Sequence, residues 1–262
     1  MPKTGPTARP RVLFFDIESA GVQGLRADRG FVVCFGYKWL GEKTTNVLTI
    51  KDYAAFRRDP HDDSALLKDV LKIMEEADLV VAHYGAKFDL PFLRSRIAKA
   101  GLKPLPQTRN TDTCLIARSY FKLSSNRLDN LAEFLDCSER KMEKGHGWPD
   151  WWMGVLKGDK ASIDKMAVYC AQDVRTLEAV YMKMRNIIPQ RYLVHHGIGL
   201  DHYVCAACGG AVQMRGTYYS EKKIWRRFQC KECGKWGRED KAIARPYSGH
   251  QPGRSNALPR SP

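Results

Sequence analysis

Three short segments of the sequence carry acidic side chains in patterns that could hold a divalent metal ion. The first is Asp16-Ile17-Glu18, which closes a continuously apolar stretch. In a β-strand, side chains two residues apart lie on the same face, so both carboxylates would point to one side of a sheet. Two carboxylates placed in this way can bind one hard cation such as Mg²⁺. The same short pattern also occurs without any metal, so a structural role for this pair stays open.

The second and third segments each add a carboxylate, and one adds a phenol. Asp89 follows an expected strand and opens an expected helix, where a negative charge is favourable even without a metal. The preceding Phe88 is expected to pack in the core and to contact a terminal base of a substrate. Tyr169 and Asp173 are four residues apart on an expected helix, which places them on the same face. A phenol and a carboxylate can then act on one site, although each alone is more often structural.

The apolar patterns around these segments predict three consecutive strands followed by alternating helices and strands. We expect strands at residues 11–18, 31–40, 44–50, 79–83 and 111–114, helices at 64–77 and 88–100, and a mainly helical region at 128–185. Ser64 is predicted to cap the first helix, and Pro189 is predicted to mark the end of the last. This order indicates an α/β fold, with a mixed sheet flanked by helices.

Four of the eight cysteines form two tight pairs and predict a zinc site. Cys205 with Cys208, and Cys230 with Cys233, follow a Cys-x-x-Cys pattern, and 21 residues separate the pairs. Four thiolates at these spacings suit one tetrahedral, structural Zn²⁺. We therefore expect a small zinc ribbon at residues 201–240. The other cysteines lie singly in apolar segments and are expected to be buried thiols: Cys34, Cys114, Cys137 and Cys170.

Basic and aromatic residues alternate between the two cysteine pairs: Arg215, Lys222, Lys223, Trp225, Arg226, Arg227 and Phe228. Such a mixture suits phosphate contacts and stacking on bases. Trp225 and Arg226 are the expected substrate-binding residues of the ribbon, and docking of a protein partner is the alternative. Trp148, Trp151 and Trp152 could also stack on unpaired bases, but packing on a helical cap is the favoured interpretation.

The chain has 262 residues and a formal net charge of +14, half of it in residues 201–262, where 12 basic residues face 5 acidic ones. A positive surface favours a polyphosphate partner, although solubility alone could explain it. The apolar stretches are far shorter than the roughly 20 residues of a membrane helix, and the N-terminus lacks the apolar segment of a secretion signal. We expect a protein of a prokaryotic or viral-host cytoplasm that binds no membrane, with a flexible N-terminus at residues 1–10 and a disordered tail at 246–262.

Taken together, the three acidic motifs resemble the DEDD superfamily of 3′→5′ exonucleases, and specifically its tyrosine-bearing branch. The resemblance spans residues 11 to about 188, within an expected catalytic domain at 11–195, and includes Asp112. The segments 128–132 and 152–159 are similar to the proofreading domains of family B polymerases. The resemblance implies an RNase H-like fold and hydrolysis of phosphodiester bonds with two Mg²⁺ or Mn²⁺ ions.

The resemblance also implies a role for each residue of the site. Asp16 would bridge the two cations, and Glu18 and Asp173 would complete the site of the cation that activates the attacking water. Asp89 would support the other cation, partly through water. Tyr169 would orient the attacking water.

One position departs from the family pattern. Such relatives usually have Asn five residues before the Asp of the second motif, and this chain has Tyr84 there. We therefore expect a different substrate contact at Tyr84. The expected substrate is a nucleic acid with a free 3′ end, with DNA favoured. The alternatives are a non-catalytic nucleic-acid-binding adaptor and an RNase H-like endonuclease or junction resolvase.

Overall fold

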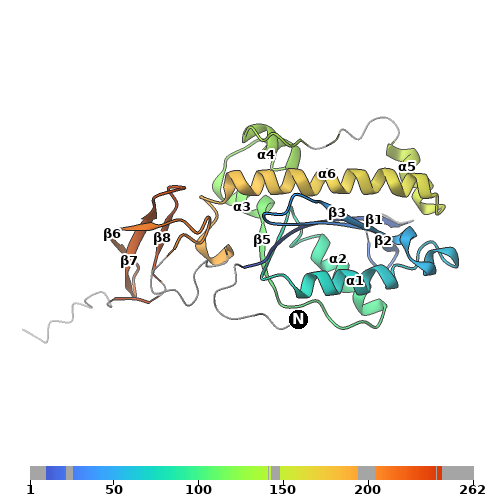
Figure 1. Ribbon diagram of the computed structural model, residues 1–262, viewed down its shortest axis with the longest axis horizontal. Helices are drawn as coiled ribbons and strands as arrows, with labels where there is room; N and C mark the ends of the chain where they lie inside the picture. The colour runs from blue at the N-terminus through green and yellow to red at the C-terminus, as the bar shows by residue number, and fades with distance from the viewer. Residues whose placement is uncertain are drawn as a thin grey trace, which may run out of the picture.

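The computed structural model describes residues 10–21, 26–140, 142, 148–193, 204–239 and 241–243. Its larger part is built on a mixed five-stranded sheet with the order β3-β2-β1-β4-β5 (Figure 1). The strands are β1 (Val12–Gly21), β2 (Gly30–Trp39), β3 (Asn46–Thr49), β4 (Leu79–Ala82) and β5 (Arg109–Asp112). Neighbours among β1, β2 and β3 pair antiparallel, whereas β4 runs parallel to both β1 and β5. The predicted mixed sheet is confirmed; the expected tail at 246–262 and residues 1–9 of the expected flexible N-terminus lie outside the described residues.

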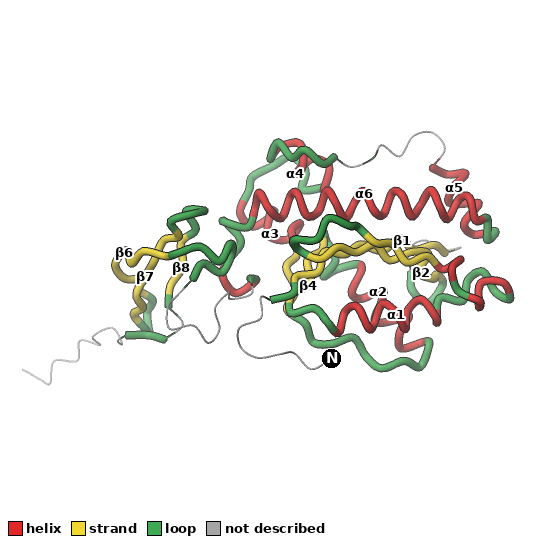
Figure 2. Tube along the Cα trace, in the orientation of Figure 1, coloured by secondary structure: helices red, strands yellow, loops and turns green. Residues whose placement is uncertain are grey.

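Helices cover both faces of this sheet (Figures 1 and 2). Helices α1 (Ser64–Glu75) and α2 (Asp89–Lys99) lie on one face, and α6 (Lys160–Met184) runs along the other. The remaining helices are α3 (Thr113–Tyr120), α4 (Leu128–Phe134), α5 (Trp148–Leu156) and the short 3₁₀ helices η1 (Ile50–Asp52), η2 (Ala54–Arg57) and η3 (Gln190–Tyr192). In the part of the chain that the structure describes, no helix has both the length and the apolar character needed to cross a membrane.

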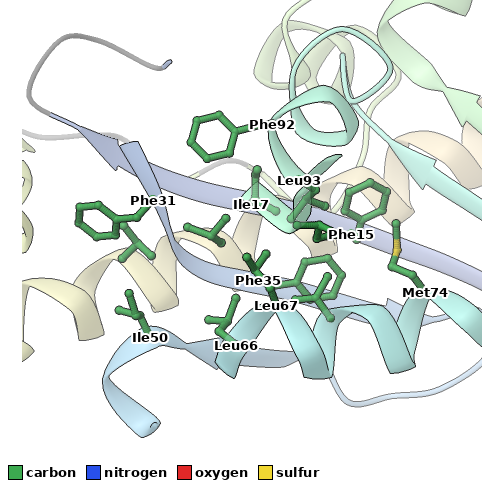
Figure 3. Packing of buried hydrophobic residues seen from close by; sticks show 14 of the residues in the cluster. Phe15, Ile17, Phe31, Phe35, Ile50, Leu66, Leu67, Met74, Phe92 and Leu93 are labelled. Atoms are coloured by element: carbon green, nitrogen blue, oxygen red, sulfur yellow. The ribbon is translucent and has the colours of Figure 1, made fainter. Parts of the chain in front are cut away.

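The central strand β1 is buried on both faces, and its alternation decides which helix each side chain meets. Odd-numbered residues such as Phe15 belong to the apolar cluster shared with α1 and α2 (Figure 3). Even-numbered residues such as Phe14 belong to the cluster shared with α6, where the Phe14 ring meets Tyr181 edge-on at 5.2 Å between centroids. Asp16 and Glu18 continue the even-numbered series, so β1 directs both carboxylates toward the α6 side of the sheet.

The start of α1 differs from the prediction. Ser64 is the first helical residue and Asp63 is the N-cap, so the assignment of the cap to Ser64 is wrong. The Asp63 carboxylate accepts hydrogen bonds from the Val32 N–H at 2.8 Å and from the Arg96 guanidinium at 2.9 Å. This buried ion pair joins the start of α1 to α2 and β2, and the Ser64 N–H is accepted by Asp62 Oδ1 at 3.0 Å.

Other departures are shifts of element ends. The strand expected at 111–114 ends at Asp112, because Thr113 already belongs to α3. Helix α6 begins at Lys160, with Asp159 as its N-cap, and ends at Met184, ahead of Pro189. The expected order of elements is therefore kept while individual ends move by a few residues.

The tryptophans before α6 favour the packing interpretation. Trp151 and Trp152 lie in α5, and Trp152 packs against the apolar cluster shared by β1, α1 and α2, which we call the main apolar cluster. Lys165 of α6 places its Nζ 5.4 Å from the centre of the Trp151 ring. The side chain of Trp148 lies outside the described residues. Two of the three residues thus join α5 to the body of the protein.

A second, smaller sheet follows η3 and lies beside the C-terminal end of α6 (Figure 1). It consists of β6 (Val212–Tyr219), β7 (Ile224–Cys230) and β8 (Trp236–Arg238) in the order β6-β7-β8. We call residues 204–239 the ribbon. Its Cys205 shares an apolar cluster with Met184 and Ile188, and the buried Lys235 Nζ donates to the carbonyls of Ile188 and, at 3.3 Å, of Asn186. The ribbon is thus packed against the larger part of the chain.

Candidate active site

A glycine lets α6 approach the acidic segment of β1, which lies within the strand and not at its end. Gly36 of β2 pairs with Asp16, and a Cβ atom at this position would lie 2.7 Å from Cys170 Sγ and 3.1 Å from Val174 Cγ2, both on α6. A Cβ atom here would force Cys170 and Val174 to move, so glycine permits the close approach of the helix to the sheet. The pairing of β1 with β2 then shifts register directly after Glu18, which ends the regular ladder beside the site.

Three carboxylates converge between β1 and α6. Asp173 lies one helical turn after Tyr169 on α6, and both side chains are buried. One carboxylate oxygen each from Asp16, Glu18 and Asp173 lies within 4.8 Å of the other two. These residues line a cavity of about 200 Å³ together with Tyr169 and Asp89. All five predicted catalytic residues therefore meet at one cavity, and three of the acids are close enough to share an ion.

Asp89 is the buried acid in the wall of this cavity. It is the first residue of α2, and its Oδ1 accepts the backbone N–H of Ile17 at 3.2 Å. Burial raises the pKa of Asp89 to about 7; the hydrogen bond from Ile17 opposes this shift and the charge of Asp112 adds to it. Near neutral pH the metal-free carboxyl is therefore partly protonated, and a nearby cation would return it to the ionised form.

Aromatic side chains lie at the mouth of the cavity. Tyr84 and Phe88 both line it. Tyr84 has a φ of 64°, a left-handed conformation that Asn adopts more readily than Tyr. Its side chain is 40% exposed, and the guanidinium carbon of Arg118 lies 5.2 Å from the centre of its ring. Phe88 packs against the main apolar cluster, with its ring 5.7 Å from that of Phe92. The core packing of Phe88 is confirmed, and base contacts by Tyr84 and Phe88 stay predictions.

Asp112 has a structural role at the end of β5. Its Oδ1 accepts the N–H groups of Tyr84 at 3.0 Å and of Cys114 and Leu115 at 3.1 Å, and its Oδ2 accepts that of Ala86 at 3.0 Å. The carboxylate therefore caps α3 and also holds the turn that carries Tyr84. Among the described residues, Asp112 is not part of the group of three clustered carboxylates.

We expect Asp112→Ala to lower the free energy of unfolding by about 2–4 kcal/mol, because four backbone N–H groups lose a charged acceptor. Urea denaturation followed by circular dichroism measures the effect. Asp129→Ala is a matched control, because Asp129 is an exposed acid in the first turn of α4. Equal losses for the two variants would contradict the anchoring role.

Sequence reasoning missed His83, Arg118 and Cys170 as neighbours of the site. His83 lines the cavity, and it could have been noticed as the first polar residue after the apolar strand β4. Arg118 reaches Tyr84 from the last turn of α3, and no sequence pattern announces that contact. Cys170 Sγ lies 3.6 Å from the Asp16 carbonyl oxygen. The pKa of its thiol is raised, mainly by a hydrogen bond with Cys34 and secondly by burial. Cys170 is therefore a neutral packing residue behind Asp16.

The four paired cysteines of the ribbon also converge. Their sulfur atoms all lie within 4.8 Å of one another, and Cys205 with Cys233, and Cys208 with Cys230, are 3.6 Å apart. A tetrahedral site with metal–sulfur bonds of about 2.3 Å separates its sulfurs by roughly 3.8 Å, whereas a disulfide requires about 2.05 Å. Backbone N–H groups also point at sulfur, as Ala207 does toward Cys205 Sγ at 3.4 Å. The donor set fits a thiolate-bound metal ion.

The two predicted binding residues of the ribbon lie on opposite faces of β7. Trp225 and Arg226 are adjacent in a strand, so their side chains point in opposite directions. Trp225 pairs with Tyr218, whereas the Arg226 Nη1 lies 3.9 Å from Glu239 Oε1. The two residues cannot contact one ligand from the same face, and a role of either in binding stays a prediction.

Comparison with known proteins agrees with this architecture. A sequence model of the RNase H superfamily matches residues 13–185, the part that contains all the clustered acids. No curated protein sequence matches the chain significantly. Among solved structures, the chain is similar to the family B DNA polymerase of the hyperthermophilic archaeon Pyrobaculum calidifontis, with a TM-score of 0.56 and 21% identity. The match covers 71% of this chain and 26% of the polymerase chain, so it shows a shared fold over about a quarter of that protein.

Proposed function

The chain belongs to the RNase H superfamily, and from that membership we propose that it is a metal-dependent 3′→5′ exonuclease that removes nucleotides from a free 3′ end, with DNA as the favoured substrate. The membership itself supports the broader statement that the protein is a nuclease, a hydrolase that acts on nucleic acid. The narrower proposal depends on one observation: the carboxylates of Asp16, Glu18 and Asp173 cluster within 4.8 Å, beside the buried Tyr169.

Carboxylate oxygens are the ligands that Mg²⁺ and Mn²⁺ prefer, so the donor set fits these ions. Two such cations, when bound, would stabilise the charge on the scissile phosphate and on the leaving 3′ oxygen. Asp16, in the middle of β1, would help to hold both of them. Glu18 and Asp173 would complete the site next to the attacking water, and Asp89 would support the other. In the ribbon, the four thiolates would hold one structural Zn²⁺.

The remaining residues of the cavity position the substrate. The Tyr169 hydroxyl would orient the attacking water, because it lies one helical turn from Asp173 on the same face of α6. Tyr84 and Phe88 would receive the terminal base at the mouth, and Arg118 would help to hold the Tyr84 ring. The ribbon would add affinity for the rest of the strand.

The direct test is incubation with end-labelled single-stranded and double-stranded DNA and RNA in Mg²⁺, in Mn²⁺ and in EDTA. We expect stepwise loss from the 3′ end in either metal and none in EDTA. A 3′-blocked oligonucleotide should resist digestion. Internal cuts in the blocked strand would indicate an endonuclease and reject the proposed direction. Absence of cleavage under every condition would favour a non-catalytic adaptor.

The raised pKa of Asp89 predicts a pH-dependent stability without divalent cations. Between about pH 4 and pH 7 the folded state binds more protons than the unfolded state, so the free energy of unfolding falls as pH rises through this window. Asp89→Asn removes this loss and should stabilise the Mg²⁺-free protein at pH 8, by on the order of 1–3 kcal/mol, with no gain at pH 4. Urea unfolding at both pH values measures it. A variant no more stable than wild type at pH 8 would contradict this account.

A further inference from the structure

One face of the ribbon sheet gathers arginine and aromatic side chains from all three strands. In its register, Arg227 of β7 lies directly opposite Arg238 of β8. Side chains directly opposite each other, or two residues apart in one strand, share a face of a sheet. We call the resulting set the arginine face: Tyr218, Trp225, Arg227, Gln229, Trp236 and Arg238.

The two arginines at the centre of the arginine face repel each other, because both carry a positive charge. Like charges directly opposite each other on neighbouring strands destabilise a sheet. Each guanidinium lies over an indole: Arg238 is 3.8 Å from the centre of the Trp225 ring, and Arg227 is 4.6 Å from that of Trp236. The Arg227 guanidinium also donates to the Arg215 carbonyl, at 3.2 and 3.3 Å, but no carboxylate of the arginine face neutralises either charge. None of the six residues of the arginine face is acidic. An anion bound between the guanidiniums would relieve the repulsion.

The other face of the same sheet is buried where it meets the second cysteine pair. It buries Phe228 and Cys230, and its Arg226 lies near Glu239. On the arginine face, by contrast, Tyr218 and Trp236 are about half exposed, at 47% and 48%. The other face also exposes Tyr219 and Met214, at 66% and 46%, so the arginine face is distinguished by its two opposed arginines and the aromatic rings beside them.

The edge strand of this face is anchored to the larger part of the chain. The Gln190 side chain donates to the Arg238 carbonyl, and the Arg238 N–H donates to Gln190 Oε1, both at 3.4 Å. The ribbon also packs against Met184, at the end of α6. Met184 follows Asp173 by three helical turns, about 16 Å at a rise of about 1.5 Å per residue. The arginine face thus stands at a fixed position beyond one end of the helix that carries the acids.

We propose that the arginine face binds single-stranded nucleic acid, with Arg227 and Arg238 on its phosphates and with Tyr218 and Trp236 stacked on unpaired bases. Sequence-tolerant binding of this kind combines a cationic track with exposed aromatic rings. The inference deepens the proposed exonuclease and rests on it for the course of the strand, which runs from the arginine face toward the cavity. At about 3.4 Å per stacked nucleotide, roughly five nucleotides cover the distance from the end of α6 to Asp173.

The binding test uses the full chain with Asp173→Asn, so that the strand is not degraded. Fluorescence anisotropy with labelled single strands of about 20 nucleotides, DNA and RNA in separate arms, gives affinity against salt concentration. Arg227→Gln with Arg238→Gln should weaken binding about 20-fold near ~0.1 M salt and reduce the salt slope by about 1.4, since each phosphate contact to a single strand contributes about 0.7. Zinc content and circular dichroism verify that the ribbon stays folded.

A matched control removes the same charge away from the face. Lys68→Gln with Lys72→Gln removes two exposed charges from α1, on the face of the large sheet opposite α6, and it should weaken binding less than about 3-fold. Equal losses would mean that net charge binds the strand and would overturn the proposal. Unchanged binding by the arginine-face variant would also overturn it and leave this surface to a protein partner. Trp236→Ala should weaken binding without changing the salt slope.

Hydrolysis by the enzyme with an intact Asp173 separates this inference from the proposed function. The arginine-face variant should hydrolyse strands of about four nucleotides as wild type does and lose activity on strands of about 20, since only the longer strand reaches the ribbon. Equal activity of variant and wild type on both lengths would reject the inference and leave the exonuclease standing. If wild type cleaves nothing, the proposed function fails, and the anisotropy comparison still decides whether the arginine face binds.

Discussion

Asp173→Asn is expected to lower phosphodiester hydrolysis by about a thousandfold or more while the protein stays folded. The substitution keeps the size of a side chain that is buried between β1 and α6 but removes one of three clustered charges. Loss of a cation that stabilises the transition state costs several kcal/mol, and each ~1.4 kcal/mol is a factor of about ten in rate. Single-turnover hydrolysis of a 3′-labelled strand in Mg²⁺ measures the rate, and thermal unfolding verifies the fold.

The same helix provides the control. Asp164→Asn changes an exposed acid of α6 that pairs with Lys51 outside the cavity, and it should retain nearly full activity. The activity of the Tyr169→Phe variant should lie between the activities of these two variants, because the substitution removes the hydroxyl and leaves all three clustered carboxylates. An Asp173→Asn enzyme as active as the Asp164→Asn enzyme would exclude Asp173 from the reaction.

The two halves of the acidic cluster could be predicted from local periodicity. The two-residue spacing of Asp16 and Glu18 places both on one face of a strand, and the four-residue spacing of Tyr169 and Asp173 places both on one face of a helix. The structure has both arrangements. These rules need only the residues of one element, which is why the sequence suffices for them.

The meeting of the two halves could not be predicted from periodicity. It depends on contacts between segments that are far apart in the chain, and only the family resemblance supplied it. Physically it requires a helix seated closely on the sheet, which Gly36 permits under Cys170. A glycine in a strand has several explanations, and nothing local says that a helix will pass over it. Asp112 is a similar case, because its four N–H donors come from two segments that only the fold brings together.

The composition of the ribbon segment alone does not predict which of its basic and aromatic side chains share a face. The run of basic and aromatic residues suggested Trp225 and Arg226 as binding residues, and strand alternation places them on opposite faces of β7. Alternation could have been applied to β7 from the sequence. The pairing of Arg227 with Arg238 could not, since it needs the register between β7 and β8. The arginine face could therefore be recognised only once the register of the sheet was known.

The segment that connects α6 to the ribbon is also bonded to β5, whose last residue lies beside the candidate active site. The segment after α6 bonds to β5, where Thr111 Oγ1 donates to the Tyr192 carbonyl and the Arg109 guanidinium donates to that of Leu193 at 2.6 Å. Asp112, the last residue of β5, holds the turn of Tyr84. The ribbon and the mouth of the cavity are thus both connected to β5. This shared support favours a fixed path for a single strand of nucleic acid between them.

Removal of the ribbon metal is expected to unfold residues 204–239 while the five-stranded sheet persists. The ribbon buries few apolar side chains of its own, chiefly Phe228 and the small residues beside Cys205, and so we expect the proposed metal ion to supply most of its stability. Structural zinc contributes roughly 10–16 kcal/mol of apparent binding free energy in small zinc modules. Cys208→Ser should therefore lose the zinc, and hydrogen exchange should show β7 amides unprotected while those of β1 and α6 stay protected.

The consequences for function follow from what the ribbon covers. Its unfolding uncovers Met184 and Ile188, so the larger part should lose some stability and still hydrolyse short strands, whereas affinity for long strands should fall as far as in the arginine-face variant. Cys137→Ala is the control, because this buried thiol lies outside the ribbon and its loss should leave one zinc per chain. Protected β7 amides in a zinc-free Cys208→Ser protein would show that packing against α6, and not the metal, holds the ribbon together.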